Sequence, residues 1–143
     1  TTIEISDIKL HILCGHHGSY FETDTTTGES IDRHRDVQNL EILFTVKGWA
    51  LFHVGDSFMS NRETYKTFGL GNKNIDILFS QWWDARENPS FRQALIRDII
   101  KPDRVIFMHQ SPSRPPKGNP ERDTSVAKEV IVPTELMQKW TFN

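Results

Sequence analysis

The chain has 143 residues, a length that fits one ordinary domain built around a single hydrophobic core. Its 17 Lys and Arg residues nearly balance its 19 Asp and Glu residues, and the formal net charge is −2. No basic stripe stands out, which excludes nucleic acid and anionic membrane surfaces as expected partners. The apolar runs are far shorter than the roughly 20 residues that span a bilayer, and the single cysteine, Cys14, cannot form an internal disulfide. We therefore expect one soluble domain over residues 1–143. The single cysteine fits a reducing compartment, which slightly favours the cytoplasm and leaves the localisation open.

The first part of the chain predicts a strand followed by a long loop. Residues 8–14 are rich in β-branched side chains and alternate in character, which is typical of a strand that ends at Gly15. His16 and His17 follow directly. Residues 18–38 contain four threonines, two glycines and many charges without any period, so we expect a long exposed loop there. Loops of about 20 residues in a compact domain are often functional.

The rest of the chain alternates between strand and helix patterns. Two strand-like runs separated by Lys47-Gly48 predict a hairpin. Asn88-Pro89 is a typical helix start, because a capping side chain precedes a proline at the first helical position. Four prolines in residues 110–125 predict a second solvated loop. The predicted elements are, in order, strands 41–46 and 49–54, a helix at 60–68 that Asn61 caps, a strand at 74–80, a helix at 88–100, strands 105–108 and 130–132, and a short helix at 135–140.

This order of elements predicts an α/β fold in which helices cover a mixed sheet. His16, Asp56 and His109 each directly follow an apolar strand, and strand ends are where ligands of α/β sheets usually collect. Two imidazoles and a carboxylate offer the nitrogen and oxygen ligands that Zn²⁺, Mn²⁺ or Fe²⁺ prefers. Taken singly, each residue has another interpretation. Asp56 is also typical of a helix N-cap, His16 could lie in a simple turn, and His109 could be a surface histidine.

In this order, the segments "HVGDS", "IDILFSQWW" and "KPDRVIFMH" resemble the C-terminal half of the metallo-β-lactamase superfamily, over about residues 8–110. The resemblance assigns His16 to the third family motif, Asp56 to the fourth, whose carboxylate bridges two metals, and His109 to the fifth. His17 is the alternative ligand for the first of these positions. The implied fold is half of an αββα metallo-β-lactamase-like sandwich, with a mixed β-sheet and helices on one face.

The sequence departs from the family in one important respect. The family's main metal motif, His-x-His-x-Asp-His, is absent from this chain. By the resemblance, that motif lies in the N-terminal half and supplies most ligands of both metal sites. We therefore expect residues 1–143 to be the C-terminal half of a metallo-β-lactamase-like domain. A chain that begins at Thr1 rather than Met also suggests a fragment, a cleaved product or one chain of a protein whose other half lies elsewhere.

The function that the resemblance implies is metal-dependent hydrolysis of a small-molecule substrate, with Zn²⁺ as the first choice of cofactor and Mn²⁺ or Fe²⁺ as alternatives. Asp56 would be the catalytic residue that keeps the metals together. Trp82 and Trp83 are candidate substrate-binding residues, although aromatic side chains after a strand more often serve packing.

Two further interpretations are open. The chain could be a non-catalytic binding or assembly module that keeps the fold without the full metal cluster, or a small α/β binding domain whose resemblance to the family is accidental. Half of a two-sheet sandwich also exposes an apolar sheet face, which is unstable in water unless it is covered. We therefore expect a homo-oligomer, or association with the missing N-terminal half.

Overall fold

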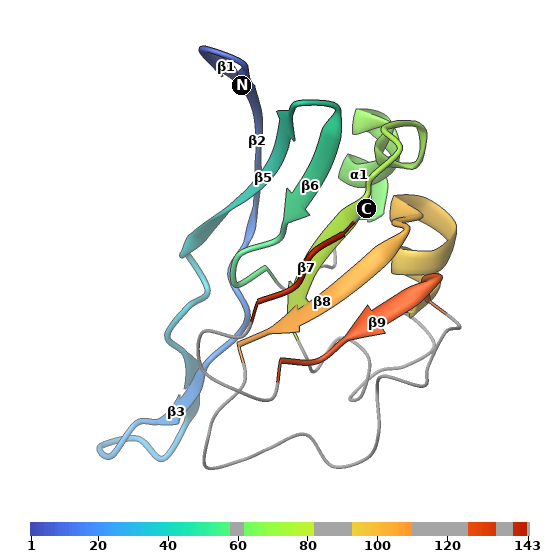
Figure 1. Ribbon diagram of the computed structural model, residues 1–143. Helices are drawn as coiled ribbons and strands as arrows, with labels where there is room; N and C mark the ends of the chain where they lie inside the picture. Colours follow the sequence, from blue (N-terminus) through green and yellow to red (C-terminus); the bar gives the residue numbers. More distant parts are fainter. Residues whose placement is uncertain (58–61, 82–92, 110–125, 134–138, 143) are drawn as a thin grey trace.

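A computed structural model of the chain describes residues 1–57, 62–81, 93–109, 126–133 and 139–142. Its main element is a seven-stranded mixed sheet in the order β1-β2-β5-β6-β7-β8-β9 (Figure 1). Neighbouring strands from β1 to β6 are antiparallel, and those from β6 to β9 are parallel. The strands of this sheet are β1 (Thr2–Ile5), β2 (Ile8–His16), β5 (Gln38–Val46), β6 (Trp49–His53), β7 (Ile77–Gln81), β8 (Arg104–Met108) and β9 (Glu129–Ile131).

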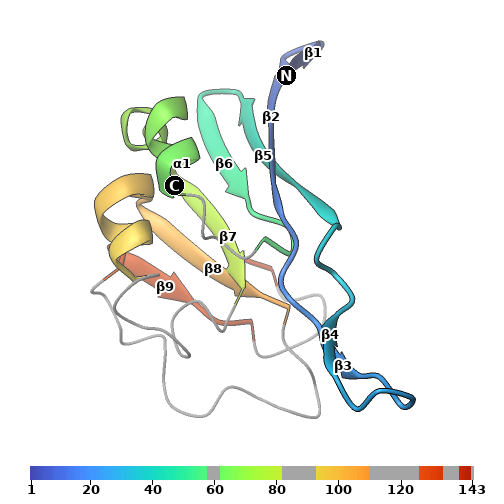
Figure 2. The same ribbon diagram turned by 180° about the vertical axis from the view of Figure 1, so that it is seen from behind.

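One face of the sheet carries the hydrophobic core. The pairing register places Leu43 opposite Phe52, and Leu78 opposite Val105, and all four side chains are fully buried. The helical elements lie over this face (Figures 1 and 2) and contribute buried aliphatic side chains to the same core. These elements are α1 (Arg62–Phe68), the 3₁₀ helix η1 (Leu70–Asn72) and the π-helix η3 (Ile96–Ile100). The predicted mixed sheet with helices on one face is therefore confirmed.

Most predicted elements lie within two or three residues of their observed bounds. The strand predicted at residues 8–14 continues to His16, and the predicted hairpin is formed by β5 and β6. α1 confirms the helix predicted at residues 60–68, and η3 confirms the end of the helix predicted at residues 88–100. Other predictions lie outside the described residues: the Asn61 cap, the helix start at Asn88, the loop at 110–125, and all but the last two residues of the 135–140 helix. No helix in the described part of the chain is long and apolar enough to cross a membrane.

Residues 18–38, predicted as a long exposed loop, are mostly exposed but contain a hairpin of β3 (Phe21–Thr23) and β4 (Ser30–Asp32), which the prediction missed. The hairpin projects away from the large sheet (Figures 1 and 2). Asp24 stabilises its turn, since one carboxylate oxygen accepts the backbone N–H groups of Thr26 and Thr27 at 2.7 and 3.0 Å. Local side-chain bonds of this kind form a turn without any hydrophobic period, so the sequence pattern gave no signal for it.

The face of the sheet opposite the helices exposes apolar side chains. Ile3, Ile5 and Ile8 share this face at the β1–β2 edge, and Leu40 continues it on β5 with 53% of its surface exposed. Part of the face is covered, because the C-terminal residues 139–142 run back along the sheet (Figure 1) and the Phe142 ring lies 5.1 Å from the Arg104 guanidinium. The described residues of β1, β2 and β5 thus present an apolar surface to solvent.

Candidate functional site

Asp56 lies in a tight turn directly after β6, next to the ends of the parallel strands. Gly55 has a φ of +60°, which glycine adopts without strain, and this conformation turns the chain away from the sheet. The buried side chain of Asn39 stabilises the turn through two hydrogen bonds. Its Oδ1 accepts the Asp56 N–H at 2.9 Å, and its Nδ2 donates to the Val54 carbonyl at 2.8 Å. The backbone of Asp56 is therefore fixed by a side chain from β5.

Two imidazoles and an amide surround the Asp56 carboxylate, of which 40% is exposed. His17 Nε2 lies 3.4 Å from Oδ2, and His109 Nε2 lies 3.4 Å from Oδ1. Gln81, which is fully buried, donates from Nε2 to Oδ1 at 3.1 Å and to the Gly55 carbonyl at 3.0 Å. The ends of β2, β6, β7 and β8 thus bring four polar side chains to one point.

The imidazole that approaches Asp56 from β2 is that of His17. His16 is the last residue of β2, pairs with Gln38 and is exposed, whereas His17 forms the next bridge, to Ser57. Successive residues of a strand point to opposite faces, so only one of two adjacent histidines can face Asp56. The structure thus brings together His17, Asp56 and His109, of which His17 was the alternative to His16 in the sequence.

A buried carboxylate lies beneath this site. Glu41 of β5 is only 1% exposed, and its Oε1 accepts hydrogen bonds from the hydroxyls of Ser57 and Tyr65, the latter at 2.7 Å. Burial raises the pKa of Glu41, and the two hydroxyl bonds act in the opposite direction. Ser57 follows Asp56 directly, so this network connects the core to the turn that carries the carboxylate.

His53 also belongs to the surroundings of Asp56. Its Nδ1 accepts the Gly55 N–H at 3.0 Å, which supports the turn from the β6 side. Burial lowers the pKa of His53, and the negative charge of Asp56 partly opposes this shift.

Sequence reasoning missed Asn39 and Glu41, although a signal was present. Both residues alternate with Leu43 along β5, so all three occupy the face that packs against the core. Polar side chains at core positions of an alternating strand are rarely buried without hydrogen-bond partners. The predicted substrate-binding residues Trp82 and Trp83 lie outside the described residues.

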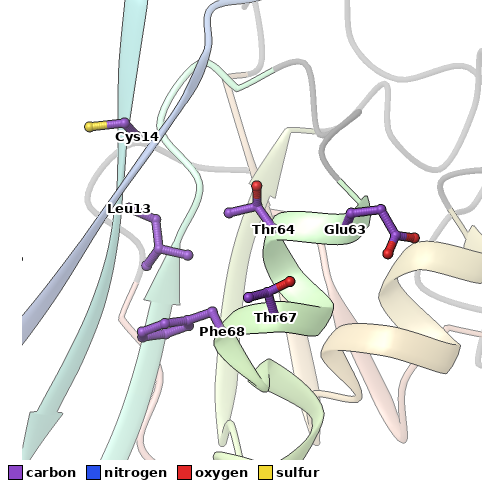
Figure 3. Close-up of a pocket in the computed structure, with 6 residues that line it drawn as sticks. All are labelled: Leu13, Cys14, Glu63, Thr64, Thr67 and Phe68. Carbon is purple, nitrogen blue, oxygen red and sulfur yellow. The ribbon is translucent and has the colours of Figure 1, made fainter.

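Within the residues that the structure describes, the Asp56 group is not a complete metal site, and the chain also has a separate pocket. In the described part of the chain, no group of three or more His, Cys, Asp or Glu side chains is arranged to hold one metal ion. An open pocket of about 440 Å³ lies between β2 and α1 (Figure 3) and shares no residue with the Asp56 group. Its lining residues are Leu13, Cys14, Glu63, Thr64, Thr67 and Phe68.

Comparisons with known proteins bear on the fold. No protein-family model matches the sequence, and a search of curated proteins gives no match. Among solved structures, the chain is similar to the metallo-beta-lactamase fold protein YhfI from Bacillus subtilis, with a TM-score of 0.55 and 13% sequence identity. The chain has a metallo-beta-lactamase-like fold. The similarity covers 93% of this chain and 49% of the YhfI chain, so this chain spans about half the length of that protein.

The metallo-beta-lactamase-like fold accounts for the position of the Asp56 group. In a sheet with parallel strands, side chains after neighbouring strands converge at one edge, although they are far apart in the sequence. Asp56 and His109 follow β6 and β8 in this way, with Gln81 at the end of the intervening β7.

Proposed function

We propose that this chain contributes part of the active site of a metal-dependent hydrolase, in which His17, Asp56 and His109 hold divalent cations, Zn²⁺ by preference. The distances between the donor atoms carry the proposal. Each imidazole Nε2 lies 3.4 Å from a different oxygen of Asp56, which is longer than an ordinary charged hydrogen bond. Two donors placed tetrahedrally on one Zn²⁺, each about 2.0–2.1 Å from the ion, lie about 3.4 Å apart. The donor set therefore fits a cation at each oxygen of Asp56.

The hydrogen bond of His17 supports the same interpretation. Its Nδ1 lies 2.8 Å from the Gly18 carbonyl, which can only accept, so Nδ1 carries the hydrogen. In the neutral imidazole, Nε2 then has a lone pair that faces the lone pairs of Asp56 Oδ2. Two acceptors in this arrangement repel each other unless a proton or a cation lies between them.

Bound divalent cations would polarise the carbonyl or phosphoryl oxygen of a small-molecule substrate and lower the pKa of a water molecule for its attack. Asp56 would be the catalytic residue that keeps the cations together, because each of its two oxygens faces one of the two histidines. Gln81 and Asn39 hold Asp56 in orientation through its side chain and its backbone. The buried Gln81 Oε1 has no hydrogen-bond partner among the described residues, so the bonds that Nε2 donates to Asp56 Oδ1 and to the Gly55 carbonyl orient the Gln81 amide.

Three ligands are too few for two complete metal sites. We propose that the remaining ligands come from a second polypeptide segment, corresponding to the part of YhfI that this chain does not cover. Trp82 and Trp83 remain the proposed substrate contacts.

Zinc titration of the purified chain tests the proposal. We expect wild type to bind Zn²⁺ weakly, and Asp56→Asn to bind it at least about tenfold more weakly, because the amide removes the negative charge and replaces one of the two oxygens that each face a histidine. His17→Asn should weaken binding by a similar factor. The measurement is competition with a chromophoric zinc chelator.

His16→Asn is the matched control, because it removes the adjacent imidazole from the opposite face of β2. We expect its zinc affinity to equal that of wild type. Unchanged affinity in Asp56→Asn would contradict the proposal. Loss of affinity in His16→Asn, with wild-type affinity in His17→Asn, would assign the ligand to His16 instead. Two tightly held ions per wild-type chain would show that the ligand set is complete without a second segment.

A non-catalytic binding or assembly module is the second candidate function. One observation favours it: no three-ligand group for a single ion is found in the described part of the chain. Wild-type protein that binds no Zn²⁺ in the same titration would select this function.

We also propose that the exposed apolar face of β1, β2 and β5 is covered in solution. In the purified chain, without the proposed second segment, a second copy of the chain would cover it. We expect Leu40→Lys to shift the protein to the monomer in sedimentation equilibrium, because a charge would be buried at the contact. Phe21→Lys is the control, since Phe21 is also exposed, at 64%, but lies on the β3–β4 hairpin. A wild-type monomer at all concentrations would contradict this proposal.

A further inference from the structure

The β3–β4 hairpin segment contributes a second histidine to the surroundings of His17. His34 Nδ1 lies 3.1 Å from the Gly18 carbonyl, which also accepts from His17 Nδ1 at 2.8 Å. Because a carbonyl can only accept, the Nδ1 atoms of both rings carry hydrogens. One backbone oxygen is therefore held between two imidazoles.

The two rings also pack against each other. Their centroids are 4.3 Å apart and their planes meet at 77°, an edge-to-face contact. Tyr20 lies against His34 as well, at a centroid distance of 5.4 Å. His34 is partly buried between these neighbours, so its ring limits the space in which the His17 ring can turn.

Backbone contacts fix His34 at this position. Asp32 Oδ1 accepts the N–H groups of His34 and Tyr20, each at 3.0 Å. The His34 carbonyl accepts the Val37 N–H at 3.0 Å, and the Val37 carbonyl accepts the His17 N–H at 3.2 Å. The segment after β4 is thus connected to the end of β2 through both side chain and backbone.

The two imidazole N–H groups restrict the orientation of the Gly18 carbonyl. Glycine has no side chain that restricts its backbone, so the peptide group after Gly18 can rotate at little cost. The Gly18 N–H donates to the Asp56 carbonyl at 2.7 Å, and the Gly18 carbonyl accepts from both imidazoles. Rotation of this carbonyl would remove the acceptor that selects the Nδ1–H tautomer of His17.

We propose that His34 is a positioning residue, which holds the Gly18 carbonyl through its Nδ1–H and thereby fixes His17 with Nε2 directed at Asp56. The inference rests on the proposed function only for its consequence in metal binding. A hydrogen-bonded partner on the second ring nitrogen is the general way in which a metal-binding imidazole is oriented, and its removal costs about 10–100-fold in affinity.

Two substitutions separate the hydrogen bond from ring packing. His34→Asn keeps an N–H donor at a place equivalent to Nδ1, whereas His34→Phe keeps an aromatic ring without the donor. Long-range ¹H–¹⁵N correlation spectra of the metal-free chain report the tautomer of His17 directly. We expect the Nδ1–H tautomer in wild type and His34→Asn, and a mixture of tautomers in His34→Phe.

Zinc titration gives the second readout. We expect His34→Phe to lower zinc affinity about tenfold, with His34→Asn close to wild type. His11→Asn is the matched control, since His11 lies in β2 against Phe68 and should change neither readout. A wild-type tautomer in His34→Phe, or a mixture in His34→Asn, would overturn the role of His34. If wild type binds no zinc, the proposed function fails, and the spectra alone still decide whether His34 positions His17.

Discussion

Gly55→Ala is expected to lower the free energy of unfolding by about 2–5 kcal/mol, the sum of about 1–2 kcal/mol for a side chain in the left-handed conformation and about 1–3 kcal/mol for a lost buried hydrogen bond. At its φ of +60°, an added Cβ would lie 2.6 Å from Asn39 Oδ1 and 3.0 Å from the Leu40 carbonyl. Asn39 would have to move, and its bond to the Asp56 N–H would be lost. Urea denaturation measures the change.

Gly69→Ala is the matched control for this substitution. Gly69 has a similar φ of +71°, but an added Cβ meets no atom within 4 Å. It should therefore show only the conformational cost, about 1–2 kcal/mol. Equal destabilisation by the two substitutions would mean that the contact between Gly55 and Asn39 has no energetic role.

Glu41→Gln is expected to make stability less dependent on pH. Burial raises the pKa of Glu41 in the folded chain above its ordinary value of 4.5, so the folded state favours the protonated form. This contribution to stability is complete below pH 4.5 and is lost as the pH rises through the folded pKa. The glutamine side chain keeps an oxygen that accepts from Ser57 and Tyr65, but it has no charge to bury.

The measurement is urea denaturation of both proteins at a series of pH values from 4 to 8, where the difference in unfolding free energy isolates residue 41. We expect this difference to shift in favour of Glu41→Gln with rising pH, by about 1.4 kcal/mol for each unit by which folding raises the pKa. Glu63→Gln is the control: Glu63 is exposed beside Lys66, and its curve should run parallel to that of wild type within about 0.5 kcal/mol. A parallel curve for Glu41→Gln would contradict the expectation.

Short-range patterns in the sequence determined most of the fold. The apolar runs of β5 to β8, the Lys47-Gly48 link and the face of the helix that ends at Ile100 each depend on neighbours a few residues apart, and the structure agrees with all three. The β3–β4 hairpin was missed because its turn is held by Asp24 through local hydrogen bonds, which leave no hydrophobic period.

Part of the candidate site could be predicted from the sequence. Strand ends could be located from apolar runs, and they led to Asp56, His109 and the pair His16-His17. The resemblance placed His16 before His17, whereas the structure directs His17 at Asp56. Adjacent residues point to opposite faces, and only the position of the turn after β6 decides which of the two faces Asp56.

The sequence by itself determined which residues follow strands and that the chain forms a mixed sheet under helices, because these properties follow from local periodicity. Only the tertiary structure decided that Asn39, Glu41, Gln81 and His34 support the Asp56 turn and His17. Their roles depend on hydrogen bonds between atoms that are up to 26 residues apart, which no local pattern records.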